Sequence, residues 1–131
     1  MQFVGLIGFL AVTAVVTAFI VYVIIFHVWA MALEMFLWTK PLGRKTFGLS
    51  KEDAETSKTL AANQGLYNGF LAAGLVLSFF VPSPDTALTL QVFFLACVSL
   101  AGLYGGITAN RSILFLQGMP ALIALALLLF A

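Results

Sequence analysis

The sequence predicts an all-α integral membrane protein, a four-transmembrane-helix bundle with both termini on the non-cytoplasmic side. Three observations predict this fold. The 131 residues are 63% hydrophobic and only 8% charged, whereas soluble domains carry about one charged residue in four. The apolar residues form four long runs, and all six Lys and Arg residues lie between runs. The length is that of one domain, so we expect a single transmembrane domain over residues 1–131.

The first apolar run predicts a helix over about residues 3–38. At about 1.5 Å per residue such a helix is roughly 54 Å long, and a bilayer core of about 30 Å needs only about 20 residues. We therefore expect it to tilt, to project beyond the lipid or to pack on neighbouring helices. The run is too long for a signal peptide and lacks a basic start. Lys40 and Pro41 end it, with Trp38 at the interface.

Residues 39–58 form a charged loop that precedes the second span, predicted over about 59–81. Ser50 and Asp53 have the spacing of an N-cap and an acidic first turn. This spacing predicts that a helix begins near Ser50 and continues without a break into the second span. The span carries a stripe of small residues that is typical of close helix contacts. The stripe consists of Ala61, Gly65, Gly69 and Ala73.

The last two apolar runs predict helices over about 86–109 and 112–131, joined by a tight turn. Two interleaved pairs of small residues predict a close contact for the third helix. In the fourth helix, Pro120 cannot donate a backbone bond to the carbonyl of residue 116 and should bend the helix near Gln117. The interleaved pairs are Ala101 with Gly105 and Gly102 with Gly106.

The orientation follows from the basic residues. The loops at 39–58 and 110–111 contain all six Lys and Arg residues, and the termini and the 82–85 turn contain none. By the positive-inside rule the two basic loops are cytoplasmic and both termini face outward.

Polar side chains from all four predicted helices lie at one depth. Counted from the nearest basic residue at about 1.5 Å per residue, they lie roughly 5–15 Å inside the cytoplasmic boundary. Ionisable groups inside a span are costly and mark functional sites by default, so Glu34 is the centre of the predicted site. Burial favours its neutral form and amide donors favour the carboxylate, so both protonation states stay open. The candidate ligand-binding residues are Glu34, Asn63, Gln64, Tyr67, Asn68, Tyr104, Thr108 and Gln117.

His27 lies two helical turns before Glu34 on the same face, near the middle of the bilayer. It fits a neutral core residue that donates one hydrogen bond, a proton relay with Glu34, or one ligand of a haem or metal. One His with one carboxylate supplies too few ligands for a typical metal site, so we expect no metal and no cofactor. If the protein is an enzyme, which the sequence leaves open, the candidate catalytic residues are Glu34, His27 and Tyr67.

Composition excludes some functions. A net charge of +1 argues against nucleic-acid binding, which needs a basic surface. The single Cys97 excludes a disulfide within one chain. We expect membrane lipids as partners, with a small amphipathic ligand and a homo-oligomer through the Gly-rich helix faces as further candidates.

Six short motifs follow one another along the chain. They are Leu33-Glu-Met-Phe-Leu-Trp38, Gly43-Arg-Lys, Phe47-Gly-Leu, Ala61-Ala-Asn-Gln-Gly-Leu-Tyr-Asn-Gly69, Gly102-Leu-Tyr-Gly and Gln117-Gly-Met-Pro120. These motifs resemble those of the domain-of-unknown-function family numbered 1304, small bacterial membrane proteins without an assigned activity. The resemblance covers about residues 20–131 and implies a four-helix protein of the bacterial inner (plasma) membrane. It also supports the polar residues of the motifs as signature positions.

These observations favour a polar pocket around Glu34 that binds a small amphipathic or lipid-like molecule. The polar layer also fits a structural network that joins the four helices. Three other functions stay open: a proton-coupled small-molecule exporter acting as a dimer, an interaction module that recruits another membrane protein through its Gly-rich faces, and an intramembrane isomerase or hydrolase.

Overall fold

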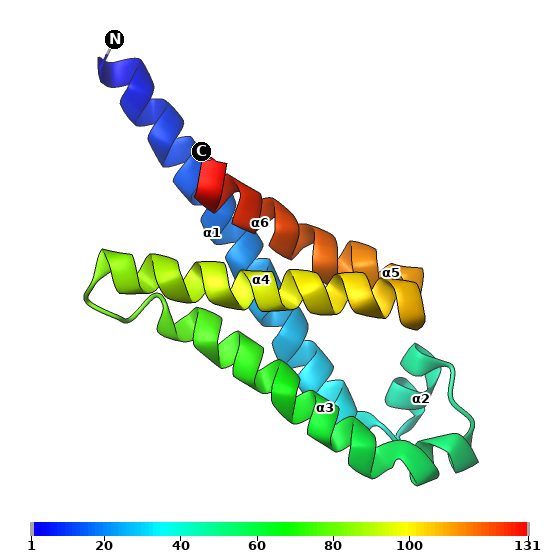
Figure 1. Ribbon diagram of the computed structural model, residues 1–131. Coiled ribbons are helices and arrows are strands. Elements are labelled where there is room, and N and C mark those ends of the chain that lie inside the picture. The colour runs from blue at the N-terminus through cyan, green and yellow to red at the C-terminus, as the bar shows by residue number, and fades with distance from the viewer. Residues whose placement is uncertain (1, 131) are drawn as a thin grey trace.

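The fold is known from a computed structural model, which describes the backbone of residues 2–130 and the side chains of residues 5–130. These residues form helices and connecting turns, with no strand among them (Figure 1), so the predicted all-helical class is confirmed. In order the elements are α1 (Gln2–Ala32), η1 (Leu33–Leu37), α2 (Pro41–Phe47), α3 (Lys51–Leu77), α4 (Pro84–Thr108), α5 (Arg111–Ile113), η2 (Leu114–Gly118) and α6 (Met119–Phe130).

Three continuous helices of the described chain are long and apolar enough to cross a membrane. They are Gly5–Leu37, Pro84–Thr108 and Arg111–Phe130. The helix α3, which contains the predicted second span, is not among them. Its first turns carry five charged residues, and Asn63, Gln64 and Asn68 interrupt the apolar sequence that follows.

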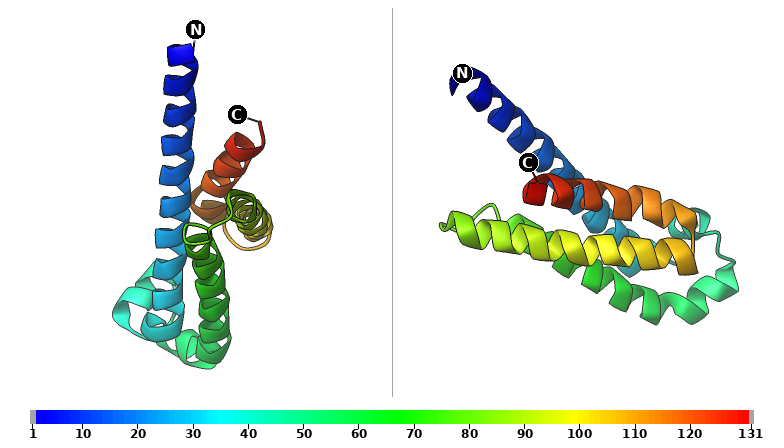
Figure 2. Two further views of the ribbon diagram at one scale, coloured as in Figure 1. Left: turned by 90° about the vertical axis from the view of Figure 1, so that its left-hand side faces the viewer. Right: turned by 45° about the horizontal axis from the view of Figure 1, so that its top comes forward.

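The helix α1 is the longest element, and α3 and α6 pack along it, whereas α4 packs mainly on α6, η2 and α3. The helix α3 runs beside the half of α1 that leads into η1, and α6 packs against both α1 and α4. In Figure 1, α4 crosses α1 at a steep angle. The N-terminal turns of α1 extend past the other helices, as both views of Figure 2 show. Of the three expectations for so long a helix, packing of its first turns on neighbouring helices is therefore not met; a tilt or a projection beyond the lipid stays a prediction.

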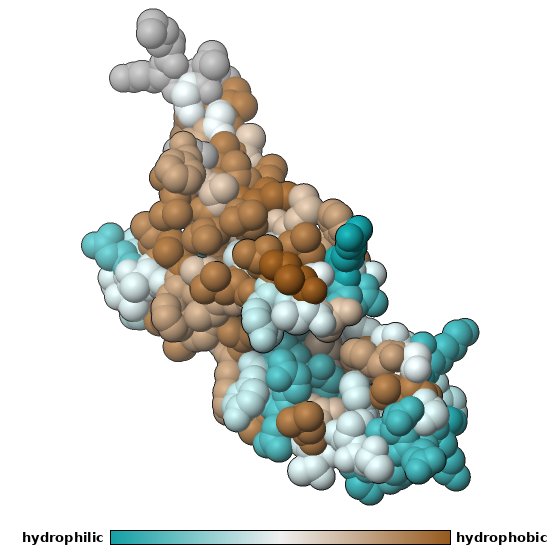
Figure 3. All heavy atoms as spheres, turned by 45° about the vertical axis from the view of Figure 1, so that its right-hand side comes forward, coloured by the Kyte–Doolittle hydropathy of each residue, from teal (hydrophilic) through white to brown (hydrophobic). Residues whose placement is uncertain are grey.

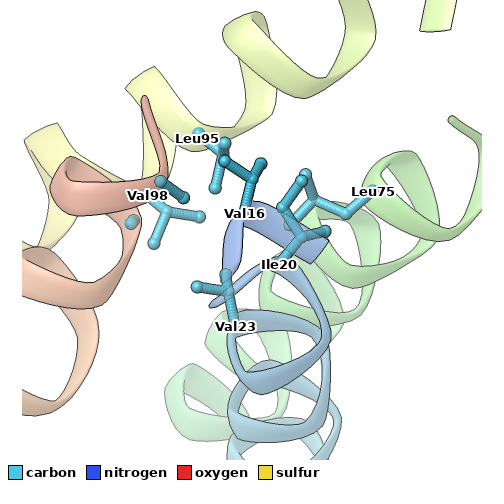
Figure 4. Close-up of a cluster of buried hydrophobic side chains, with 8 residues drawn as sticks. Val16, Ile20, Val23, Leu75, Leu95 and Val98 are labelled. Atoms are coloured by element: carbon cyan, nitrogen blue, oxygen red, sulfur yellow. The ribbon is translucent and has the colours of Figure 1, made fainter. Parts of the chain in front are cut away.

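One apolar core joins the four long helices (Figure 4). The helix α1 contributes Val16, Ile20 and Val23, a spacing of four and three residues that keeps the side chains on one face. Leu75 of α3 packs against them, and the rest of the core comes from α4 and α6. These residues are Leu95, Val98, Ala121 and Ala124.

The helix α3 begins as the sequence predicts. Its N-cap is Ser50, whose side-chain oxygen accepts a hydrogen bond from the backbone N–H of Asp53 at 3.0 Å. The stretch before it differs from the expected open loop, because α2 lies within residues 39–58. Pro41 is at the start of α2, and Gly48, with a left-handed φ of 66°, caps its end. A Pro at the start and a Gly after the end are the signals that could have revealed α2.

The predicted small-residue contacts occur within the chain at the glycines, whereas Ala73 and Ala101 of the predicted sets are exposed. A Cβ added to Gly65 would lie 2.7 Å from Met35 Cγ and 3.0 Å from Glu34 Cβ, so Gly65 lets α3 approach η1. A Cβ on Gly102 would lie 2.3 Å from the Cα of Gly118. The backbones of α4 and η2 therefore touch at this point. Both glycine faces thus bring together helices of the same chain.

Two short π-helices, η1 and η2, interrupt the long helices, and each contains one of the predicted polar residues, Glu34 and Gln117. Of these two interruptions, only the one near Gln117 is predicted by the sequence, from Pro120. There the Tyr22 hydroxyl of α1 donates a hydrogen bond of 3.0 Å to the carbonyl of Leu116. This is the carbonyl whose α-helical donor Pro120 lacks.

We expect Tyr22→Phe to lower the stability of the protein by about 1 kcal/mol, because the Leu116 carbonyl loses its donor. The same change should cost less in a Pro120→Ala background, where residue 120 regains an N–H. Thermal unfolding of the four members of this double-mutant cycle in detergent measures the difference. Equal losses in both backgrounds would show that Tyr22 and Pro120 act independently.

Candidate functional site

Glu34 and Asn68 form a direct pair between η1 and α3. The side-chain amide of Asn68 donates a hydrogen bond of 2.7 Å to Oε2 of Glu34. Asn68 is buried, with 8% of its surface exposed, and Glu34 is part-buried. Charge-assisted bonds of this kind are about twice as strong as bonds between neutral groups when the acid is ionised.

The sequence of α3 explains why Asn68 faces Glu34. Buried residues recur every seventh position along α3, at Ala54, Ala61, Asn68 and Leu75, a repeat that keeps one stripe toward the partner helix. Gly65 lies one turn before Asn68 on the same side and removes the side chain that would hold η1 away. Asn68 is therefore the polar member of an otherwise small and apolar contact face.

His27 and Gln117 form a second polar pair, between α1 and η2. The His27 ring is completely buried, and its Nδ1 lies 2.7 Å from the carbonyl of Val23. Because a carbonyl only accepts, Nδ1 carries the proton and donates it. In the neutral ring Nε2 is then an acceptor, and the Gln117 amide nitrogen lies 3.4 Å from it. The geometry thus fits a neutral imidazole that joins two helices.

Five of the predicted site residues lie outside these pairs, on exposed positions of α3 and α4. The amide of Asn63 donates to Thr59 O at 3.0 Å, and the hydroxyl of Thr108 donates to Tyr104 O at 2.7 Å, both within one helix. Tyr67 and Tyr104 are 57% and 72% exposed. The described polar side chains thus form two separate pairs. They do not form one layer that joins all the helices. The five residues are Asn63, Gln64, Tyr67, Tyr104 and Thr108.

Two polar contacts that the sequence did not predict lie beside the two pairs, at η2 and at the end of η1. The Tyr22 hydroxyl binds η2 as described above. The Trp38 indole N–H donates to the Ser57 hydroxyl at 3.0 Å, and that hydroxyl donates to Asp53 O at 2.6 Å. This chain of bonds ties the end of η1 to the first turns of α3. Trp38 was assigned only an interfacial position, and no short-range pattern connects it with Ser57.

A groove of about 770 Å³ lies beside the N-terminal half of α1, and no candidate site residue lines it. Its walls include Phe9 and Ile20 of α1, Phe79 after α3, Gln91 of α4 and Leu127 of α6. Within residues 2–130, no three His, Cys, Asp or Glu side chains are grouped so that they could hold a metal ion.

The sequence matches the family described as Protein of unknown function (DUF1304) over residues 20–129. The chain belongs to the DUF1304 family. The resemblance of the short motifs is thereby confirmed. The DUF1304 match includes Glu34, Asn68, His27 and Gln117, whereas much of the α1 wall of the groove precedes residue 20. The two polar pairs are therefore the candidate site of the part of the chain that defines DUF1304.

Among curated proteins, this DUF1304 chain is similar to the Uncharacterized protein YpaA of Lactococcus lactis subsp. lactis (strain IL1403). The two are 36% identical over 97 residues, which cover 72% of this chain and 80% of that protein. No solved structure matches the DUF1304 chain.

Proposed function

We propose that this protein is a multi-pass protein of the bacterial inner (plasma) membrane that binds a small amphipathic or lipid-like molecule at Glu34. In the proposed topology α3 supplies a fourth crossing with its apolar second half, and both termini face outward. The loop that contains α2 and the turn at Asn110–Arg111 then face the cytoplasm. The three membrane-length helices support this arrangement, and so does the placement of all six basic residues in the loop that contains α2, in the first turns of α3 and at Arg111.

The observation that carries the proposal is the part-buried carboxyl of Glu34 in a π-helix, inside a helix of membrane length. Carboxyl groups inside such helices are costly, and π-helices recur at functional sites. Asn68 binds one of the two carboxyl oxygens. An ionised carboxylate has about four acceptor positions, so it can also receive a hydroxyl, amide or amine of a ligand.

The exposed flank of α3 suggests where such a ligand would lie. Gln64 and Tyr67 lie close to Asn68 in sequence, and both are exposed. The amide and phenol groups can donate and accept hydrogen bonds, and the Phe70 ring lies 6.2 Å from the ring of Tyr67. This combination suits a molecule with a polar head and an apolar body.

Native mass spectrometry of the full chain in mild detergent tests the proposal. We expect an adduct of defined mass on the wild type whose occupancy falls about tenfold or more in Glu34→Gln, because a bond to a charged group is worth about 1.5–3 kcal/mol. Glu55→Gln is the matched control, since Glu55 is an exposed carboxylate and its variant should keep the adduct. No adduct on the wild type, or one that Glu34→Gln retains, would overturn the proposal.

The direct Glu34–Asn68 bond favours a second candidate, a structural role in which the pair only joins η1 to α3. This function predicts no adduct and a lower melting temperature for Glu34→Gln. The glycine contacts argue against an interaction module that uses these faces, since Gly65 and Gly102 are already packed within the chain.

A further inference from the structure

The segment that contains α2 and leads to the start of α3 is rich in basic residues. Residues 39–51 contain four basic residues and no Asp or Glu. We call these four residues, Lys40, Arg44, Lys45 and Lys51, the basic end of the protein. Figure 3 shows hydrophilic side chains gathered at one end of the molecule, below the hydrophobic surface.

In the described part of the chain, no cation of the basic end forms an ion pair within 4.0 Å; the one such pair joins Lys58 to Glu55 at 2.9 Å, and Lys58 lies outside the basic end. The hydrogen bond and charge of Lys58, with smaller contributions from the more distant charges of Lys51 and Lys40, hold the pKa of Glu55 below its usual range. Glu55 therefore bonds directly to Lys58 and interacts with the basic end only at a distance. Arg44 Nε is buried, and none of the described residues accepts a bond from it. A buried charged donor of this kind is costly unless an acceptor binds it.

Backbone contacts hold α2 at the point where the membrane-length helix ends. Gly43 packs under η1 so closely that an added Cβ would overlap the carbonyl of Leu37. The N–H of Lys40 donates to Leu37 O at 3.0 Å, and the N–H of Leu49 donates to Arg44 O at 2.9 Å. These contacts place Arg44 next to the boundary of the helix that ends at Leu37.

Apolar side chains accompany the charges on the same segment. Leu42 is 47% exposed and Phe47 is 40% exposed. The Phe47 ring packs on Trp38, with 4.6 Å between the ring centroids. Basic residues beside exposed apolar side chains are typical of segments that lie in the membrane interface, and Trp is enriched at that depth.

We propose that the basic end binds the phosphate groups of anionic phospholipids in the cytoplasmic leaflet. The four cations supply charge complementarity, and Leu42 and Phe47 insert beside the headgroups. The Arg44 guanidinium donates no hydrogen bond to any described residue, so its terminal N–H groups can bind a phosphate. A guanidinium matches a phosphate in geometry and can bind it in a bidentate manner. This inference rests on the membrane placement proposed above and does not depend on ligand binding at Glu34.

The test uses the full chain in mild detergent with equal amounts of phosphatidylglycerol and phosphatidylcholine that carry the same acyl chains. We expect native mass spectra of the wild type to show phosphatidylglycerol preferred on the order of tenfold, and the preference to fall when the ammonium acetate concentration is raised, because salt screens the attraction. In the triple variant Lys40→Gln, Arg44→Gln, Lys45→Gln the two lipids should bind almost equally. Lys58→Gln, which removes a cation already paired with Glu55, should keep the preference.

Three results would overturn the inference. They are equal binding of both lipids to the wild type, a preference that salt does not change, and a triple variant that keeps the wild-type preference. If the triple variant loses helical content by circular dichroism, the salt series on the wild type decides the question. The Glu34-dependent adduct is expected to persist in the triple variant, so the two proposals can fail separately.

Discussion

Gly102→Ala should strongly destabilise the protein. The new Cβ would lie 2.3 Å from Gly118 Cα and 2.4 Å from Gly118 N, so it meets backbone that cannot rotate away. Overpacking of this kind costs about 1–3 kcal/mol and occasionally more. In a protein of this size we expect the melting temperature in detergent to fall by roughly 5–12 °C.

The matched control for this change is Gly8→Ala. A Cβ on Gly8 would meet nothing within 4 Å, and Ala favours the helix over Gly, so the melting temperature should stay the same or rise slightly. A Gly102→Ala protein that melts with the wild type would show that α4 and η2 are not in backbone contact.

Asn68→Leu should also strongly lower the stability of the protein. It removes the donor to Glu34 Oε2 and leaves a part-buried carboxyl beside an apolar side chain. Leaving a buried polar partner unsatisfied costs about 1–3 kcal/mol, and more for a charged one. We expect thermal unfolding of this variant to show a fall of roughly 5–10 °C.

The double variant Glu34→Leu, Asn68→Leu identifies the cause of that loss. Replacing both partners by apolar residues is often nearly neutral, so the double variant should be more stable than Asn68→Leu alone. Asn63→Leu is the control, because Asn63 is exposed on the same helix and binds only its own backbone. Losses that simply add would show that the bond between Glu34 and Asn68 contributes nothing to stability.

Short-range patterns predicted much of the helical framework. Ser50 and Asp53 located the start of α3, and the spacing of Gly65 and Gly69 predicted a close helix contact. Pro120 predicted a distortion near Gln117, where η2 lies. Each of these features depends on residues within about one or two turns of each other, which is why the sequence reveals them.

The pairing of the polar residues could not be predicted in the same way. Counting residues along each helix gives the depth of a side chain in the membrane but not the direction in which it points from the helix axis. The count therefore could not separate buried Asn68 from exposed Asn63 and Tyr67. Depth also gave no reason to pair His27 with Gln117, 90 residues away. No Pro follows η1 as closely as Pro120 follows η2, and the π geometry of η1 changes the rotation of the residues after Glu34.

The two π-helices make the packing of the chain sensitive to insertions and deletions. A π turn holds about one more residue than an α turn, so the face that follows it is shifted by roughly 100° relative to an uninterrupted helix. In η1 the adjacent residues Glu34 and Met35 both lie close to Gly65. The alignment of Trp38 and α2 with α3 therefore depends on the number of residues between Leu33 and Leu37 as well as on their identity. A chain one residue shorter there could keep every polar group and still lose the register that brings them together.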